Sequence, residues 1–477
     1  MLHSTSFKIN MCAVLGLLVT LVLLGTASGQ LLVQEPMATP VHHASAPGTL
    51  IVPASNLQQQ PPRGHHYVAH TNVQIFRPAG LRPDEAPPYS GYGYETPASI
   101  ACHYGLVSTS QAPNCNPNTT TVNPTGGSKT IAIVDAFDDP AAPGDLAWYS
   151  VFFGLPFTAQ QFQVVPAMTV NSSCYYYGYV PTDESGGWEA EESLDIEMAH
   201  AMAPGAKIYL VEACSNLDTD LQQAVLVATN LVRCGLTEIN PSTGVLGTCP
   251  SNSTGKGEVS MSFGGDEFIG ENGTTGCAPP SGTMFNDSCF TTTGVVYFAS
   301  SGDAPGVIWP GTSPNVVSAG GTAIRRNDVT FNFIQEVPWA DAGGGLSAVE
   351  ARPSYQSSIS SIVGAHRGVP DLSFDADPET GVWVYDTFPL YGYDYYEWAI
   401  FGGTSVSSPA LAGIINRAGA FAASSNAELT TMYTNKANTA DFTDIVAGYC
   451  GFYRGFSATS GWDFCTGIGA DKAYTGK

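Results

Sequence analysis

A candidate nucleophile lies near the C-terminal end of the chain, in the run Gly402-Gly403-Thr404-Ser405. The two glycines allow a close backbone approach, and the small and apolar residues from Ala410 to Ile415 are typical of a buried helix. This pattern predicts that Ser405 lies where a strand turns into a helix. A serine at such a turn is either a helix N-cap or a nucleophile, and a nucleophile needs a neighbouring group that takes its proton.

Candidate bases lie upstream in an acidic segment, residues 189–203, which is predicted to be a helix because Pro204-Gly205 ends it and an apolar strand follows. Residues four apart share a helix face, so Glu191 and Asp195 can share a hydrogen bond, and Glu192 is nearly as close to Asp195. The alternative is that these acidic residues only solvate a helix whose N-terminal dipole favours them.

A third carboxyl, Asp303, follows a predicted buried strand, residues 295–299, in the turn Ser300-Ser301-Gly302-Asp303. In open α/β sheets the carboxyl ends of the strands carry the functional site, so a carboxyl at this position is a candidate site residue. The alternative is an aspartate that only stabilises a turn.

Together these segments resemble the sedolisin family of serine-carboxyl peptidases. The family pattern Gly-Thr-Ser-x-x-x-Pro falls on Gly403 to Pro409, and its glutamate four residues before an aspartate falls on Glu191 and Asp195 in a Leu-Asp-Ile context. Its aspartate in a Ser-Gly-Asp turn falls on Asp303. It is this resemblance that selects Glu191 over Glu192.

The resemblance implies a subtilisin-like α/β fold, with a mostly parallel sheet covered by helices on both faces of one large catalytic domain. It also implies hydrolysis of protein or peptide substrates by a Ser405–Glu191–Asp195 triad through an acyl-enzyme. Glu191 would take the serine proton, and Asp195 would hold Glu191 and share its proton. Asp303 would be protonated, because a carboxylic acid can donate a hydrogen bond to the oxyanion that a carboxylate would repel. We therefore expect activity at acid pH.

The resemblance extends to a C-terminal loop that binds one structural Ca²⁺ in the family. Its ligands would be the carboxylates of Asp444 and Asp463 and the backbone carbonyls of Ile445, Thr459 and Gly461. Carboxylate and carbonyl oxygens are the ligands that Ca²⁺ prefers. The alternative is two turn aspartates without a metal.

The charge of the chain is strongly acidic, with 41 acidic and 17 basic residues and a formal net charge of −24 at pH 7. Nucleic-acid binding needs basic patches, so this composition argues against a nucleic-acid partner. Protonation near pH 4 would remove most of the charge, which agrees with a protein that works in acid.

Residues 1–29 are predicted to be a signal peptide, because Lys8 precedes the apolar run from Met11 to Leu24 and small residues precede Gln30. An uncleaved anchor is the alternative. Of the 11 cysteines, Cys12 lies in this segment, and the other ten suit an oxidising compartment. Nearest-neighbour pairing predicts Cys102–Cys115, Cys234–Cys249, Cys277–Cys289 and Cys450–Cys465, which leaves Cys174 and Cys214 to pair with each other. We expect a secreted monomer with no membrane association after signal cleavage.

Residues 30–94 are rich in Pro, Gln and His and are predicted to be a low-order segment, whereas residues 95–477 are predicted to form the peptidase domain. Strands are expected at residues 130–134, 207–211, 258–263 and 294–299, and helices at residues 145–153 and 221–232. Short apolar strands alternating with helices indicate a parallel sheet.

Two rival functions remain open. An ordinary subtilisin would need a catalytic histidine, and His200 lies five residues after Asp195, away from the carboxylate face of the helix. Asp135, in a segment that resembles the strand with the subtilisin aspartate, is given no catalytic role. The second rival is a catalytically inactive sedolisin fold that serves as a secreted binding protein, because sedolisins usually carry a folded propeptide and here only a short segment precedes the domain.

Overall fold

The computed structural model describes residues 48–80, 87, 92–107, 113–235, 246–277, 285–393, 397–451, 453 and 455–473. The predicted signal peptide and residues 30–47 lie outside this part of the chain. Within the described residues, no helix is both long enough and apolar enough to cross a membrane.

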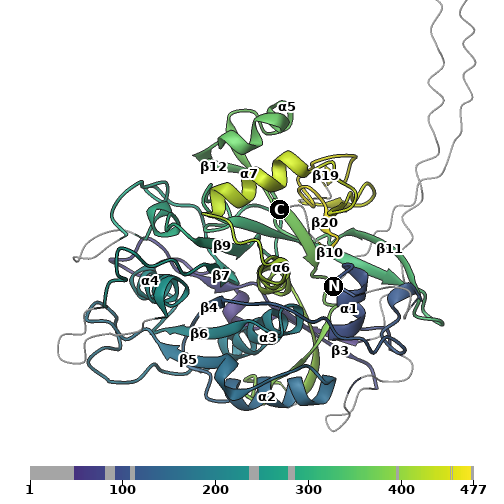
Figure 1. Cartoon of the computed structure of the whole chain (residues 1–477), viewed down its shortest axis with the longest axis horizontal. Coiled ribbons are helices and arrows are strands. Elements are labelled where there is room, and N and C mark those ends of the chain that lie inside the picture. The colour runs from purple at the N-terminus through teal and green to yellow at the C-terminus, as the bar shows by residue number, and fades with distance from the viewer. Residues whose placement is uncertain are drawn as a thin grey trace, which may run out of the picture. The chain divides into compact units, whose positions relative to one another are not determined.

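A mostly parallel ten-stranded sheet forms the centre of the fold (Figure 1). Nine of its strands run in the order β17-β20-β14-β10-β9-β7-β4-β6-β5, and β11 pairs with β10. The central parallel strands are β5 (Phe162–Pro166), β6 (Lys207–Ala213), β4 (Thr130–Ala136), β7 (Gly257–Met261), β9 (Val295–Ser300), β10 (Val317–Arg326) and β14 (Leu372–Asp375). Parallel strands align their carboxyl ends at one edge of a sheet, and the candidate site residues lie at this edge.

The sheet is covered on both faces, as strand β4 shows. Ile131 and Ile133 belong to one buried apolar cluster, and the alternating Ala132 and Val134 belong to another. Helices α2 (Ala142–Phe153), α3 (Gly187–Met202) and α6 (Thr404–Ala418) contribute to the first cluster, and α4 (Asp218–Cys234) contributes to the second. A parallel sheet with apolar residues on both faces requires this double cover.

Helices α3 and α6 pack closely against each other (Figure 1). A Cβ added to Gly413 on α6 would lie only 2.8 Å from the Cβ of Met202 on α3, so the glycine permits the close approach. The helix that carries Glu191 and the helix that begins beside Ser405 are therefore held as one unit.

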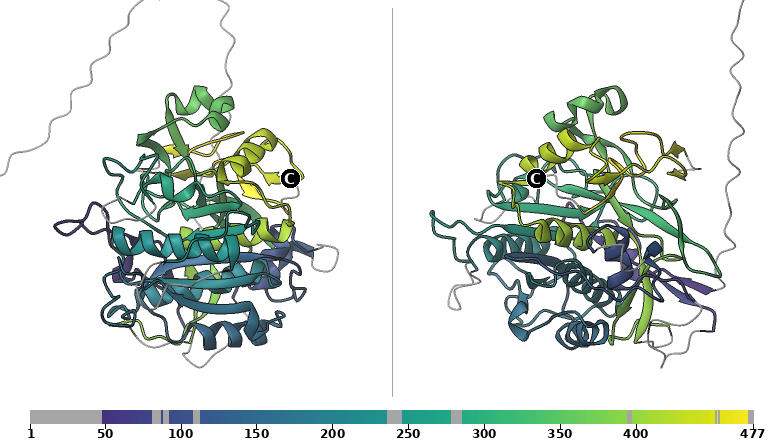
Figure 2. Two further views of the ribbon diagram at one scale, coloured as in Figure 1. Left: turned by 60° about the vertical axis from the view of Figure 1, so that its left-hand side comes forward. Right: turned by 45° about the vertical axis from the view of Figure 1, so that its right-hand side comes forward.

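A second, four-stranded sheet has the order β1-β3-β16-β15, with β1 at Gly48–Ile51, β3 at Gln74–Pro78, β15 at Val382–Tyr385 and β16 at Trp398–Gly402. Figure 2 shows the purple N-terminal strands beside the yellow-green hairpin of β15 and β16. A short strand β2 (His70–Thr71) also pairs with β8 (Phe263–Gly264).

Residues 48–80 thus differ from the low-order segment that their composition predicts. The segment contains a short run, residues 67–76, whose side chains are all buried. The polar and proline-rich residues on either side of this run dominate the composition of the segment. This run gains its order from strands that lie nearly two hundred or more residues later in the chain, so local composition does not reveal it.

Among the remaining described elements, β11, β17 and β20 belong to the ten-stranded sheet. The helices are α1 (Pro97–His103), α5 (Ser360–Val363) and α7 (Ser425–Asn435). The strands are β11 (Phe333–Pro338), β12 (Gly345–Ala351), β13 (His366–Val369), β17 (Phe442–Thr443), β18 (Tyr449–Cys450), β19 (Phe456–Ser457) and β20 (Ala470–Asp471).

The predicted elements of the sheet are confirmed with small changes at their ends, and so is the α/β fold class. The helix predicted at residues 145–153 begins at Ala142, and the one predicted at residues 221–232 extends from Asp218 to Cys234. The strand predicted at residues 258–263 is divided at Ser262 into β7 and β8. This division turns the chain toward the candidate site.

All five predicted disulfides are present: Cys102–Cys115, Cys174–Cys214, Cys234–Cys249, Cys277–Cys289 and Cys450–Cys465. Five disulfides are typical of proteins that fold in an oxidising compartment.

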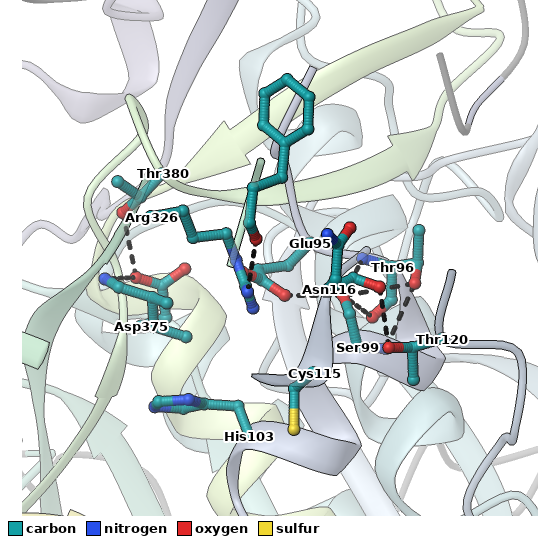
Figure 3. A network of polar contacts seen from close by, with 12 residues as sticks. Glu95, Thr96, Ser99, His103, Cys115, Asn116, Thr120, Arg326, Asp375 and Thr380 are labelled. Carbon is teal, nitrogen blue, oxygen red and sulfur yellow. Dashed lines mark hydrogen bonds and ion pairs between the residues drawn. The ribbon is translucent and has the colours of Figure 1, made fainter. Parts of the chain in front are cut away.

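A buried polar network fixes the start of α1 against the sheet (Figure 3). Arg326 on β10 donates from Nε to Glu95 Oε1 at 2.5 Å, and Ser99 Oγ donates to the other oxygen, Glu95 Oε2, at 2.6 Å. Thr96 caps the helix by accepting a hydrogen bond from the Ser99 N–H. Because each charged group in this ion pair is partnered, the buried charges are tolerated.

Candidate active site

Ser405 lies in the first turn of α6, immediately after β16. The turn requires glycine at position 403, which has a φ of 97° and stands at the helix N-cap. A Cβ at Gly403 would lie 2.0 Å from the Asn72 carbonyl oxygen and 2.5 Å from Asp303 Oδ2. Gly403 thus allows the backbone of the serine turn to approach Asp303 and the N-terminal segment.

The structure brings Glu191 and Asp195 to this serine from helix α3. Ser405, Glu191 and Asp195 are all 0% exposed, and Asp303 is 9% exposed. The Ser405 hydroxyl donates to the Ser262 carbonyl oxygen at 3.2 Å. It is also close enough to Glu191 to act as a hydrogen-bond donor that lowers the pKa of that carboxyl. The serine can therefore pass its proton to Glu191 with little movement.

Burial raises the pKa of Glu191 and of Asp195 well above the ordinary values, and repulsion by Asp135 adds to the effect in both cases. The Glu191 and Asp195 carboxyls lie close enough that a proton on one can be shared with the other. Two neighbouring carboxyls in a dry site cannot both ionise easily, so the pair retains a proton. The pair can accept the serine proton only while at least one of its two carboxyls is ionised.

Asp303 follows β9 and faces the same turn. It accepts hydrogen bonds from the Thr404 N–H at 2.7 Å and the Thr404 hydroxyl at 3.0 Å. Burial raises its pKa to about 7, although the hydrogen bonds from Thr404 act in the opposite direction. In acid Asp303 is therefore a neutral carboxylic acid and can donate a hydrogen bond.

Three residues that sequence reasoning left without a role also lie at the site. Asp135 lies one residue before the end of β4, is fully buried, and has a pKa that burial raises to about 8. Asn72 donates its backbone N–H to Glu191 Oε2 at 3.2 Å, and Asn56, in the short helix η1 (Ala54–Asn56), donates from Nδ2 to Asp303 Oδ2 at 3.3 Å. Asp135 was detectable as a carboxyl at the end of a central strand, whereas no local signal marks the two asparagines.

Glu192 and His200 lie elsewhere. Burial raises the pKa of Glu192, and the next largest contributions come from Glu212 and Asp139. His200 packs edge-on against Phe157 at 5.4 Å, and burial lowers its pKa to about 4. His200 is therefore a packed histidine, as its place on the helix predicts.

In the candidate calcium loop, each of the two carboxylates accepts hydrogen bonds from backbone N–H groups. Asp463 accepts hydrogen bonds from the N–H groups of Thr459 and Cys465, both at 2.9 Å, and Asp444 Oδ2 accepts one from the Gly461 N–H at 2.9 Å. Burial raises the pKa of Asp463, and repulsion by Asp444 contributes in the same direction. Two carboxylates that repel each other in one loop fit a divalent cation.

The rest of the proposed ligand set consists of backbone oxygens. Among the described residues, no hydrogen bond ends on the carbonyl oxygens of Ile445, Thr459 or Gly461, so these oxygens are available. The same part of the chain contains no group of three or more His, Cys, Asp or Glu side chains that could hold a metal. A cation in this loop would thus depend on the carbonyls as well as the carboxylates.

Comparison with known proteins identifies relatives in one family, although no family model matches the chain. Sedolisin from Pseudomonas sp. (strain 101) is 32% identical over 186 residues, which are 35% of this chain and 29% of that protein. Kumamolisin from Bacillus sp. (strain MN-32) is 30% identical over 319 residues, which are 61% of this chain and 50% of that protein. The chain spans half or less of the length of these curated relatives.

A solved structure of Pseudomonas sedolisin, described as a serine-carboxyl proteinase complexed with two molecules of pseudo-iodotyrostatin, has the same fold. The TM-score is 0.57 at 21% identity, and the match covers 80% of this chain and 96% of that one. The expected subtilisin-like α/β architecture is therefore present. In sequence the chain is thus similar to sedolisin and kumamolisin over part of their length, and in fold it is similar to Pseudomonas sedolisin.

Proposed function

We propose that this protein is a secreted peptidase that hydrolyses peptide bonds of proteins in acid, with Ser405 as nucleophile. The observation that carries the proposal is the convergence of Ser405, Glu191, Asp195 and Asp303 in one buried site. A binding protein has no physical need for all four groups together, so the catalytically inactive alternative is not favoured.

The first step of the proposed reaction is attack by the Ser405 hydroxyl oxygen on the substrate carbonyl carbon. Glu191 takes the hydroxyl proton, and Asp195 orients Glu191 by sharing a proton with it. The negative charge that develops on the carbonyl oxygen is stabilised by the Ser405 backbone N–H and by protonated Asp303. Glu191 then delivers the proton to the leaving amine.

The second step is hydrolysis of the acyl-enzyme by water, with Glu191 again as base. Both steps need a Glu191–Asp195 pair with at least one ionised carboxyl and an Asp303 with its proton. Because the pKa of Asp303 is about 7, the proton that it donates is lost at neutral pH. The mechanism therefore works in acid.

The test is cleavage of a denatured protein at about pH 4, compared with the Ser405→Ala variant. We expect the unaltered chain to produce peptides and the variant to produce none above background. A peptide aldehyde should inhibit by forming a hemiacetal with Ser405. An activity maximum at neutral or alkaline pH would contradict the carboxyl mechanism.

We further propose that Asp444 and Asp463, with the carbonyls of Ile445, Thr459 and Gly461, hold one structural Ca²⁺. Repulsion between the two carboxylates and the carbonyl oxygens that accept no hydrogen bond among the described residues support this role. When bound, the ion would supply a hard positive charge that orders the loop stapled by Cys450–Cys465. No step of the peptide hydrolysis depends on it.

Secretion as a monomer is part of the same proposal. Five disulfides favour an oxidising compartment, and the N-terminal sequence resembles a signal peptide. The net charge of −24 agrees with protein substrates and not with a nucleic-acid partner. Size-exclusion chromatography of protein secreted into culture medium tests both the compartment and the oligomeric state.

A further inference from the structure

A group of exposed tyrosines lies on the connection between β5 and α3. The tyrosine loop, residues 174–179, has the sequence Cys-Tyr-Tyr-Tyr-Gly-Tyr. Tyr176 is 86% exposed, Tyr177 is 74% exposed and Tyr179 is 62% exposed. Single exposed aromatic side chains are common on protein surfaces, whereas several on one short loop indicate a surface that binds a partner.

The tyrosine loop is fixed to the body of the protein. The Cys174–Cys214 disulfide joins it to the residue that follows β6. Within the loop, the Cys174 carbonyl oxygen accepts a hydrogen bond of 2.9 Å from the Tyr177 N–H. The preceding residue, Ser173, donates its N–H and its hydroxyl to the Asp220 carboxylate on α4, at 2.7 and 2.6 Å. Because the loop is already ordered, its rings can contact a partner without a further loss of backbone freedom.

The tyrosine loop is uncharged in acid and at neutral pH alike. No Asp, Glu, Lys, Arg or His occurs from residue 174 to residue 182, although the chain as a whole has a formal net charge of −24 at pH 7. Phenol groups titrate near pH 10, whereas most carboxylates lose their charge near pH 4. Recognition by carboxylates therefore weakens in acid, and recognition by these rings does not.

A second pair of exposed tyrosines is bound to the same connection. Tyr391 is 81% exposed and Tyr393 is 45% exposed. The Tyr391 N–H donates to the Ser185 carbonyl oxygen at 2.9 Å. Ser185 lies six residues after the tyrosine loop and two residues before the start of α3, the helix that carries Glu191. Both sets of tyrosines are therefore held on the approach to the helix of the candidate general base.

A short series of contacts leads from the tyrosine loop to the nucleophile. Asn216, two residues after Cys214, accepts a hydrogen bond of 2.9 Å from the Ala69 N–H and donates one of 2.7 Å to the Ala69 carbonyl oxygen. Ala69 lies three residues before Asn72, whose carbonyl oxygen accepts a hydrogen bond of 3.1 Å from the Ser405 N–H. An extended chain advances about 3.3 to 3.6 Å per residue, so a polypeptide of about a dozen residues is long enough to reach from Ser405 to the rings.

We propose that the tyrosine loop is a second binding surface for unfolded protein substrates, and that it holds one stretch of a polypeptide while another stretch is cleaved at Ser405. This inference rests on the proposed peptidase function and names its substrate class. The partner is an extended apolar stretch of a protein that acid has unfolded. Tyrosine rings bind such a stretch by apolar contact, and their hydroxyls can hydrogen bond to its backbone. Folded proteins bury these stretches, and a short peptide does not reach the rings.

The first experiment measures binding in the Ser405→Ala chain, so that no cleavage interferes. The probe is fluorescently labelled serum albumin that has been reduced and alkylated and therefore stays unfolded. Fluorescence anisotropy is measured at about pH 4 in about 0.3 M salt, which screens attraction between charges. Replacing Tyr176, Tyr177 and Tyr179 together by serine should raise Kd by about tenfold or more, because aromatic side chains carry much of the affinity of protein interfaces.

Tyr453→Ser in the same Ser405→Ala chain is the matched control. Tyr453 is fully exposed and lies outside both sets of tyrosines, so this variant should bind the unfolded albumin as tightly as its parent. All the replaced side chains are exposed, so the melting transitions of the variants and the parent should agree. Equal Kd values for the triple variant and for Tyr453→Ser would overturn the proposal.

The second experiment restores Ser405 and compares two substrates. The triple variant should raise KM for the unfolded albumin by about tenfold at unchanged kcat. It should leave kcat/KM for a peptide of about six residues unchanged, because this peptide is too short to reach the loop. A loss of the same size for both substrates would show that the tyrosines support the active site itself, and the proposal would be wrong.

The two experiments separate this proposal from the proposed function. If the unaltered chain cleaves neither substrate while the binding difference persists, the peptidase proposal is wrong and the tyrosine loop still binds unfolded protein. If both substrates are cleaved and the triple variant behaves as its parent, the peptidase proposal stands and the binding surface is wrong. Binding of cellohexaose, a neutral oligosaccharide, that is lost in the triple variant while albumin binding is retained would assign the rings to sugars and would also overturn the proposal.

Discussion

Glu191 and Glu192 are consecutive residues of α3, yet their carboxyls lie in different surroundings. Glu191 Oε2 accepts a hydrogen bond from the Asn72 N–H beside Ser405, whereas Glu192 is placed against Glu212 and Asp139. Both are fully buried and both have raised pKa values, so neither burial nor charge separates them. The two glutamates differ only in the direction in which each side chain leaves the helix.

The first prediction compares these two glutamates. Glu191→Gln should lower kcat by about 10² to 10⁴, because an amide cannot take the serine proton. Glu192→Gln, an equally conservative change one residue away, should alter kcat by less than about tenfold, since Glu192 does not contact Ser405. Steady-state hydrolysis of a peptide substrate measures both. Similar losses at the two positions would show that the general base is assigned to the wrong glutamate.

The second prediction concerns the proton on Asp303. Asp303→Ala should lower kcat by about 10² to 10³, the usual cost of removing one oxyanion donor. Asp303→Asn should retain more activity and extend it to higher pH, because an amide donates a hydrogen bond without a titrating proton. The measurement is the pH profile of kcat/KM on either side of pH 7, where Asp303 titrates. Identical profiles for the unaltered chain and Asp303→Asn would remove Asp303 from the oxyanion hole.

The third prediction is that the protein is more stable in acid than at neutral pH. Burial raises the pKa of Asp135 to about 8, of Glu212 to about 9 and of Glu271 to about 9. Between the ordinary carboxyl pKa of about 4 and these raised values, the folded state binds more protons than the unfolded state, so stability falls as pH rises. Melting curves of Ser405→Ala, which avoid self-digestion, should show a lower Tm at pH 8 than at pH 5.

Asp135→Asn supplies the control for this pH dependence. The amide does not titrate, so this variant should lose less stability between pH 5 and pH 8 than its parent. A Tm that is constant or rises over this range, in the parent chain, would contradict the raised carboxyl pKa values.

The fourth prediction tests the calcium loop without an activity assay. Added Ca²⁺ should raise the Tm of Ser405→Ala, because an ion that binds only the folded state stabilises it by about 2.7 kcal/mol at a hundredfold excess over Kd. Asp463→Asn should abolish the calcium-dependent shift, whereas Glu184→Gln, at an exposed carboxylate outside this loop, should preserve it. The shift should weaken in acid as the ligand carboxyls become protonated. Equal shifts in both variants would place the ion elsewhere.

Short-range patterns in the sequence were enough to predict the elements of the sheet, the serine turn and the disulfides. The apolar runs at residues 130–134 and 207–211 became β4 and β6 because parallel strands covered on both faces are apolar throughout. The four disulfides with the shortest spacings join cysteines 12 to 15 residues apart, so nearest-neighbour pairing found them. Helical spacing alone also placed Glu191 and Asp195 on one face.

Tertiary structure decided what lies across the site and which carboxyls meet there. Local composition suggested little order for residues 48–80, yet β2 and β3 form because β8 and β16, far along the chain, offer unpaired strand edges. Asp135 joins Glu191 and Asp195 because a strand end and a helix face meet in space. Such contacts depend on long-range packing, which no local period or propensity encodes.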